Sequence, residues 1–113
     1  MFIAIVQIPT DGKRSKEEAV EGGVASAPNF LGKKGLIRKD YLNGDEGRGG
    51  VYLWESREAA EAWYNEDWWP MMEKRFGARP SLTYYDTYVT VDNAAGEVRV
   101  DGQPVALARD AAE

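Results

Sequence analysis

The stretch GGVYLWESREAAEAW, residues 49–63, decides the fold because it contains a strand that passes directly into a helix. As far as Trp54 it is rich in β-branched and aromatic residues, which is typical of a strand. Ser56 then has the side chain of a helix N-cap, and the acidic Glu58 suits the positive end of the helix dipole. We therefore predict a strand over 49–55 and a helix that begins immediately after it.

This helix is predicted to break and restart. Its apolar residues keep one helical face as far as Tyr64, whereas Asp67 resembles a fresh N-cap and Pro70 is tolerated in a first turn. Gly77 is typical of a helix C-terminus. Beyond it, residues 82–91 are rich in β-branched residues and tyrosine, which predicts a long final strand.

Upstream, residues 2–8 form an apolar β-run that ends in a cluster of turn residues. Ser15 and Glu18 have the spacing of a capping box, which predicts that a first helix begins there. Gly22 and Gly23 interrupt this helix. They either weaken it, at about 1 kcal/mol each against alanine, or mark a close approach of the helix to a sheet or a ligand.

Residues 35–42 predict the second strand, and the polar residues after them predict a loop to Gly47 that is too long for a two-residue hairpin turn. The resulting order is β-α-β-β-α-β. This order is the ferredoxin-like arrangement of the α+β class, in which a four-stranded antiparallel sheet carries two helices on one face.

The opposite face of such a sheet is left bare. Val51 and Leu53 alternate with Tyr52 and Trp54, so both faces of the third strand are apolar. Large exposed apolar faces are rare on monomers, and the simplest cover is the same face of a second copy related by a two-fold axis. We therefore predict a homodimer.

We predict that residues 1–93 form this domain and that residues 94–113 are a C-terminal extension. Within the extension, residues 98–102 are compatible with a short extra hairpin. Residues 108–113 are polar enough that we expect a disordered tail.

The composition excludes several classes of protein. A chain of 113 residues forms one compact domain, and 14 basic against 19 acidic residues, a net charge of −5, argue against a nucleic-acid partner. The chain has no histidine and no cysteine, so it lacks the usual ligands of zinc and haem, and we expect no cofactor. The apolar start, residues 2–6, is too short for a signal peptide or a membrane anchor, so we expect a cytoplasmic protein.

Residues 35–93 carry a resemblance to a known family. A strand over 49–54 ends in a tryptophan, the capping Ser56 follows almost at once, and a second tryptophan, Trp63, comes nine residues after the first. This segment resembles the dimeric α+β-barrel superfamily of antibiotic-biosynthesis monooxygenases, and within it the YdhR-type proteins. The segment 76–93 is similar more loosely.

The resemblance implies a cavity between the sheet and the helices, where a polycyclic phenol or quinol is oxidised by molecular oxygen without a metal or flavin. The protein would then need only to bind, orient and desolvate the substrate and stabilise its anion. Relatives that degrade haem have a ligand histidine at the position of Glu73, so this residue argues against haem. The same relatives place an asparagine where this chain has Gln7, a longer amide.

The predicted substrate-binding residues share polar or aromatic side chains and positions near the expected cavity; they are Gln7, Lys39, Tyr41, Tyr52, Trp54, Trp63 and Trp68. No catalytic residue is predicted. Trp54 shares a strand face with Tyr52 and could stack on a planar substrate, with ordinary core packing as the alternative. The same alternative applies to Trp63 and Trp68, which flank the predicted helix break.

Two orientations of the second strand remain open. If Lys39 and Tyr41 face the helices, they could stabilise and hydrogen-bond a phenolate. In the other orientation Arg38 and Asp40 point inward and form a buried pair across the dimer.

These patterns support three hypotheses. The first is a cofactor-independent monooxygenase that acts on a hydrophobic, ring-containing phenol or quinol. The second is a non-catalytic module that binds a small aromatic ligand or another partner, because a fold does not fix a chemistry. The third is an isomerase of the same superfamily, whose proton shuttle would have to come from Asp, Glu, Lys or Tyr.

Overall fold

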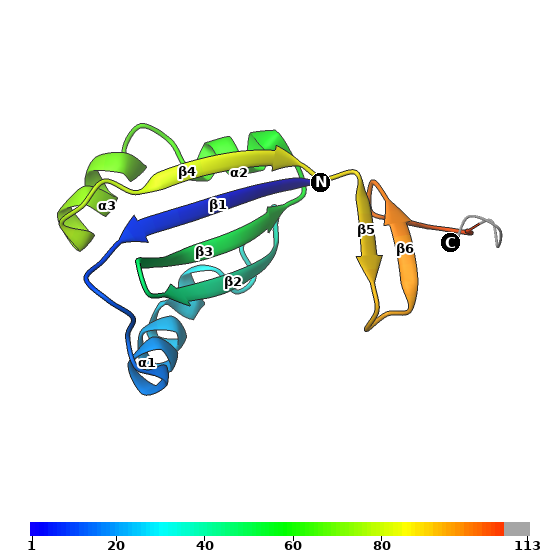
Figure 1. The fold of residues 1–113 in the computed structure, drawn as a ribbon. Helices are drawn as coiled ribbons and strands as arrows, with labels where there is room; N and C mark the ends of the chain where they lie inside the picture. Colours follow the sequence, from blue (N-terminus) through cyan, green and yellow to red (C-terminus); the bar gives the residue numbers. More distant parts are fainter. Residues whose placement is uncertain (108–113) are drawn as a thin grey trace.

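The computed structural model describes residues 1–107 of the chain (Figure 1). The elements are, in chain order, β1 (Phe2–Pro9), α1 (Lys16–Ser26), the short 3₁₀ helix η1 (Ala27–Asn29), β2 (Leu36–Gly44), β3 (Gly47–Trp54), α2 (Arg57–Trp63), α3 (Trp68–Phe76), β4 (Ser81–Asp86), β5 (Val89–Asp92), β6 (Glu97–Val100) and β7 (Gln103–Val105). The first four strands of the chain form one antiparallel sheet in the order β2-β3-β1-β4.

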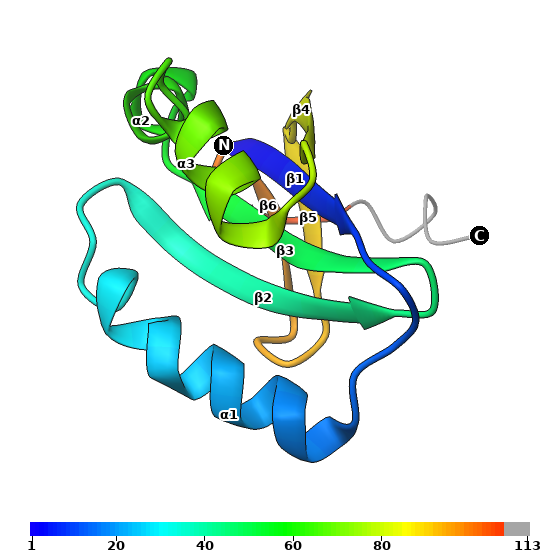
Figure 2. The same cartoon turned by 90° about the vertical axis from the view of Figure 1, so that its left-hand side faces the viewer.

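This topology confirms the predicted ferredoxin-like α+β fold. The sheet has its helices on one face, with α1 set apart from α2 and α3 (Figure 2). Within residues 1–107, no helix combines the length and the apolar character that crossing a bilayer requires.

The predicted helix ends are confirmed, with one change at the helix break. Ser15 and Glu18 form both hydrogen bonds of the capping box, and the Ser56 hydroxyl accepts from the amide of Ala59. Between α2 and α3, however, the capping side chain is Asn65 and not Asp67. The Asn65 Oδ1 atom accepts from the Asp67 amide at 3.0 Å and from the Trp68 amide at 3.2 Å.

The turn between β2 and β3 is shorter than predicted. Gly44 pairs with Gly47, so Asp45 and Glu46 alone form the turn and the predicted longer loop is wrong. Glycine at 47 allows β3 to approach β1 closely here, because a Cβ atom at this position would lie 2.5 Å from the Ile8 carbonyl oxygen. A polar, glycine-rich sequence therefore remains part of the sheet.

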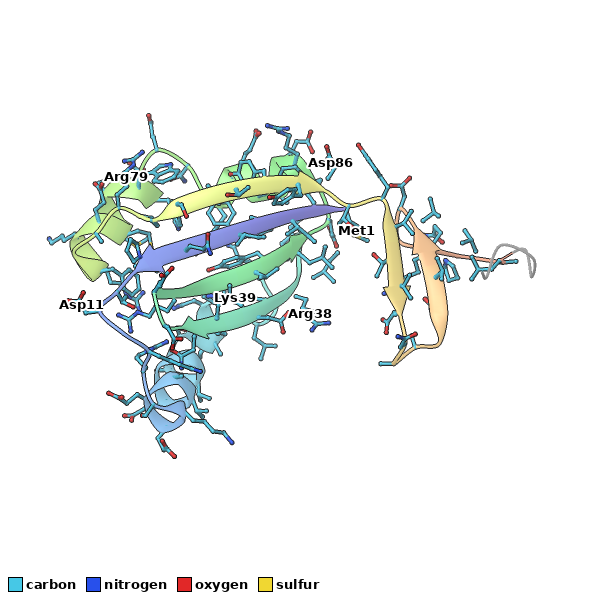
Figure 3. All side chains as sticks on the ribbon, in the orientation of Figure 1. Met1, Asp11, Arg38, Lys39, Arg79 and Asp86 are labelled. Atoms are coloured by element: carbon cyan, nitrogen blue, oxygen red, sulfur yellow. The ribbon has the colours of Figure 1, made fainter. Side chains whose placement is uncertain are left out.

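The predicted long strand over 82–91 is also wrong, because it is two strands. β4 ends at Asp86, whose partner Phe2 is the first residue of β1, so there is no further strand for β4 to pair with. The Thr87 amide donates to the Met1 carbonyl at 3.0 Å, and the chain then turns away into β5. Figure 3 labels Met1 and Asp86 at this corner.

The hydrophobic core lies on the helix-covered face of the sheet. Alternate residues of β1, the two aromatic residues of β3, three helix residues and the C-cap residue of α2 form it: Phe2, Ala4, Val6, Ile8, Tyr52, Trp54, Ala60, Tyr64, Trp68 and Met72. The other face, which no helix covers, carries half-buried apolar side chains, among them Ile3, Ile5, Val51 and Leu53. Of these, Leu53 borders the hollow that β2 shares with β5 and β6.

β5, β6 and β7 form a separate three-stranded antiparallel sheet that extends from the end of β4 (Figure 1). It begins at Val89, four residues before the boundary we predicted at residue 93. A hairpin joins β6 to β7 through Asp101 and Gly102, both with positive φ. The predicted disordered tail, 108–113, lies outside the described residues.

The C-terminal sheet has one polar and one apolar face. On the polar face, Arg99 forms ion pairs with Asp92 at 3.0 Å and with Glu97 at 2.7 Å. The register places the other side chains of these strands together as a valine face, formed by Val89, Val91, Val98, Val100 and Val105. None of these valines is buried.

Candidate functional site

A cavity of about 550 Å³ lies between the helices and the covered face of the sheet, a volume typical of small-molecule sites. Its lining comes from the three α-helices, from η1, from strands β1, β2 and β3, and from residues just outside α1 and η1: Val6, Ile8, Arg14, Gly22, Gly23, Ser26, Asn29, Phe30, Lys39, Tyr41, Arg48, Gly49, Tyr52, Trp63, Trp68, Met71, Met72, Arg75 and Phe76. Two other hollows lie at the β2–β3 turn end of the sheet and between β2 and the C-terminal sheet. The first has no aromatic lining residue, and the second shares Phe30, Lys39 and Tyr41 with the cavity but lacks Tyr52, Trp63 and Trp68.

Aromatic side chains form one wall of the cavity. The Phe30 ring lies edge-on to Tyr52 and to Trp63, with ring centroids 5.8 and 5.5 Å apart. Edge-to-face and offset arrangements of this kind fix the rings and leave flat apolar surface for a planar ligand. Met71 and Met72 of α3 complete the lining with side chains that adapt to irregular shapes.

Lys39 is the cation in the middle of this wall. A β-bulge at Ile37 shifts the register of β2, and Lys39 then lies opposite Tyr52 on the helix-covered face (Figure 3). Its Nζ atom lies 3.6 Å from the centroid of Phe30 and 4.0 Å from that of Tyr41. Burial, with a smaller contribution from the positive charge of Arg75, lowers the pKa of Lys39 to about 8.

Tyr41 closes the cavity on the side of α1. Its ring packs over Gly23 of α1, where an added Cβ would be in ordinary van der Waals contact at 3.7 Å. The Tyr41 hydroxyl is 2.6 Å from Ser26 Oγ, and Ser26 Oγ donates to the Gly23 carbonyl at 3.2 Å. Because the Ser26 proton is used in this way, the Tyr41 hydroxyl donates its own proton to Ser26 Oγ.

Three arginines line the cavity with Lys39. Arg48 of β3 and Arg75 of α3 both lie over the Phe76 ring, with their guanidinium carbons 5.2 Å from its centroid. Arg14 precedes α1, and two hydrogen bonds between its backbone and the Asn43 side chain hold it at the end of β2. Burial and the charges of Arg14 and Arg75 lower the pKa of Arg48 below its usual value.

Five of the seven residues predicted for substrate binding line this cavity: Lys39, Tyr41, Tyr52, Trp63 and Trp68. Gln7 does not, because alternation along β1 places it on the opposite, exposed face. Trp54 is fully buried in the core, where its indole N–H donates to the Tyr64 hydroxyl at 3.3 Å, so core packing is its role in this structure.

Four further residues line the cavity but were not predicted from the sequence as site residues: Arg14, Phe30, Arg48 and Arg75. One signal for Arg48 was present, because residues 48, 50, 52 and 54 share a face of one strand. The predicted alternative orientation, in which Arg38 and Asp40 point inward, is not observed. These two side chains form an exposed ion pair of 2.8 Å on the face opposite Lys39.

Glu73 and Asp86 lie away from the cavity. Glu73 is 3.6 Å from Arg79 and does not line the cavity, and Asp86 is exposed at the end of β4 (Figure 3). Within residues 1–107 no three Asp, Glu, His or Cys side chains gather as a metal site would require.

No protein-family model matches the chain, and no curated protein sequence matches it. Among solved structures, the fold is similar to that of a monooxygenase from the gene ActVA-Orf6 of Streptomyces coelicolor, crystallised in complex with the ligand nanaomycin D. The TM-score is 0.59 at 15% identity, over 80% of this chain and 90% of that chain. The chain therefore has the fold of this monooxygenase, and the closer resemblance to YdhR-type proteins stays a prediction.

Proposed function

We propose that the protein is a monooxygenase that oxidises a hydrophobic, ring-containing phenol or quinol with molecular oxygen and needs no metal or flavin. The observation that carries this proposal is the aromatic cavity with Lys39 at its centre, whose pKa is lowered to about 8. A lysine with a pKa near the working pH is suited to general base catalysis. The shared fold with a monooxygenase supports the same reaction class.

In the proposed reaction, the neutral Lys39 amine accepts the proton of the phenol. The phenolate then gives one electron to oxygen, and the two radicals combine to form a carbon–oxygen bond at a ring carbon that carries hydrogen. Loss of water from this peroxide leaves a carbonyl group, so one oxygen atom enters the product and the other leaves as water. The substrate supplies all the electrons.

The side chains around Lys39 fit the steps of this proposed reaction. Phe30, Tyr52 and Trp63 provide flat apolar surface that excludes water from the ring. Once Lys39 is protonated, its charge stays close to the phenolate oxygen in a site of low polarity, where such an interaction is strong.

Oxygen consumption tests this proposal. We expect chelator-treated protein to consume one molecule of oxygen for each molecule of an anthrol or naphthol oxidised, with one atom of ¹⁸O₂ in the product. Quenching of tryptophan fluorescence by the same compounds without oxygen uptake would support the non-catalytic binding module instead. A product of unchanged mass would support an isomerase.

We also propose that two copies pair through the bare faces of their four-stranded sheets. Ile3, Ile5, Val51 and Leu53 form an apolar patch on this face, and burying it against an identical patch removes it from water. The proposal does not alter the cavity, which lies on the other side of each sheet.

Light scattering after size-exclusion chromatography tests the dimer. We expect a particle of twice the 12.6 kDa chain mass. Ile5→Lys places a charge in the middle of the patch and should give single chains, because desolvating that charge opposes pairing. Val24→Lys, at an exposed position of α1, is the matched control and should stay paired. A wild-type protein that remains a single chain at high concentration would contradict this proposal.

A further inference from the structure

The charge of the cavity is opposite to that of the whole chain. The chain carries a net charge of −5, yet the charged residues that line the cavity are Arg14, Lys39, Arg48 and Arg75, without an Asp or Glu among the described lining residues. None of these four forms an ion pair with a side chain of residues 1–107. The acidic residues are therefore elsewhere on the molecule.

The arginines are held close together without a partner for their charge. The Nε atoms of Arg14 and Arg48 are buried and have no hydrogen-bond partner within residues 1–107. Arg48 and Arg75 share the Phe76 ring, and Arg14 extends along α1, where an added Cβ on Gly22 would lie 2.9 Å from its guanidinium nitrogen. Unpaired buried donors and neighbouring like charges both cost free energy, which a bound anion would recover.

We propose that the ligand of this cavity is an aromatic acid, whose carboxylate is bound by Arg14, Arg48 and Arg75 while its ring lies on the aromatic wall near Lys39. A guanidinium group matches the two oxygens of a carboxylate with two parallel N–H donors, which gives short, charge-assisted hydrogen bonds. The inference deepens the proposed function, because it defines the substrate class as a ring-containing phenol that also bears a carboxylate.

The register sets the distance between the two ends of such a ligand. Lys39 lies opposite Tyr52, and Arg48 is four residues from Tyr52 along β3, which is about 13 Å at the usual rise of a strand. The long side chains of Arg48 and Lys39 shorten the gap between their charged ends. A fused ring system with its hydroxyl and its carboxylate at opposite ends fits this arrangement.

Binding of two matched compounds tests the inference, measured by tryptophan fluorescence under nitrogen so that no oxidation occurs. 6-Hydroxy-2-naphthoic acid should bind at least about tenfold more tightly than its methyl ester, because only the acid carries the charge. Raising the salt concentration should reduce this ratio. Arg48→Gln and Arg75→Gln should each bring the ratio close to one while the affinity for the ester stays within about twofold.

Lys74→Gln is the matched control, because Lys74 is an exposed neighbour of Arg75 that does not line the cavity. This variant should keep the wild-type ratio. Equal affinities of the wild-type protein for acid and ester would overturn the inference, as would a ratio that survives in the Arg48→Gln, Arg75→Gln double variant. Far-ultraviolet circular dichroism verifies folding of each variant. Because the ratio is measured without turnover, absence of oxygen uptake would refute the proposed reaction and leave the acid preference standing.

Discussion

Replacing Lys39 with methionine should lower kcat/KM for phenol oxidation by about 10²-fold or more, the usual contribution of a positioned general base. Methionine fills a similar space between Phe30 and Tyr41 but cannot accept the proton. Lys39→Arg should be impaired to a similar degree, because arginine keeps the positive charge and does not release its proton in this pH range. Initial rates of oxygen uptake with a naphthol measure both effects.

The pH dependence distinguishes a base from a fixed charge. The pKa of Lys39 is lowered to about 8, and the charged or titratable groups near it are Arg75, Tyr41 and Tyr52. Only the neutral amine accepts a proton, so kcat/KM of the wild-type protein should rise with pH through about 8 and then level off. Lys39→Met should lack this rise, and it should recover activity only where the phenol ionises in solution. A wild-type rate that falls through the same pH range would contradict the base role.

The free energy of unfolding of Lys39→Met shows whether a loss of activity in this variant comes from a loss of folding. The pKa of Lys39 is about 8 in the folded chain against 10.5 as its ordinary value. Between these two pH values the unfolded chain binds more protons, so stability of the wild-type protein should rise with pH in this window. The methionine variant removes a half-buried charge and should be at least as stable at neutral pH. Urea unfolding at pH 7 and at pH 10 measures the difference.

Trp54→Ala should destabilise the fold by about 3–5 kcal/mol, the usual cost of removing a large aromatic side chain from a core. Trp54 is fully buried, stacks on Tyr52 with centroids 6.3 Å apart, and its loss leaves the Tyr64 hydroxyl without its donor. Urea denaturation measures the free energy of unfolding, and an unchanged slope with denaturant would show that the folded state keeps its compactness.

Trp63→Ala is the matched comparison, because Trp63 is half-buried and lines the cavity. It should cost much less stability than Trp54→Ala and should weaken binding of naphthol ligands more strongly, measured by calorimetry. If Trp54→Ala were as stable as the wild-type protein and bound ligand weakly, Trp54 would belong to the site and not to the core.

The sequence predicted well those features that depend on neighbouring residues. The capping box at Ser15, the cap at Ser56 and the C-terminal Gly77 each involve contacts within one helical turn, so their spacing was enough. The β2–β3 turn and the end of β4 were predicted wrongly, because both depend on a partner strand. Gly47 stays in the sheet because of its contact with β1, and β4 ends because β1 begins at Phe2.

The candidate site could be predicted only in part for the same reason. Alternation along the second strand grouped Lys39 with Tyr41 but left open which face of the sheet they share, and the β-bulge at Ile37 was not foreseen. The low pKa of Lys39 arises from burial by side chains of other elements, which no local pattern encodes. The sequence alone therefore showed no base. The arginine cluster joins a loop, a strand and a helix, and only the tertiary structure brings them together.

The valine face of the C-terminal sheet has a consequence for the shape of the molecule in its assemblies. This sheet has no buried side chain among the described residues, and one backbone hydrogen bond, from Thr87 to Met1, joins its base to the four-stranded sheet. An element with few contacts to the rest of a protein takes its orientation from the surface that it packs against. A surface that buries the five valines would therefore fix the direction in which this arm points.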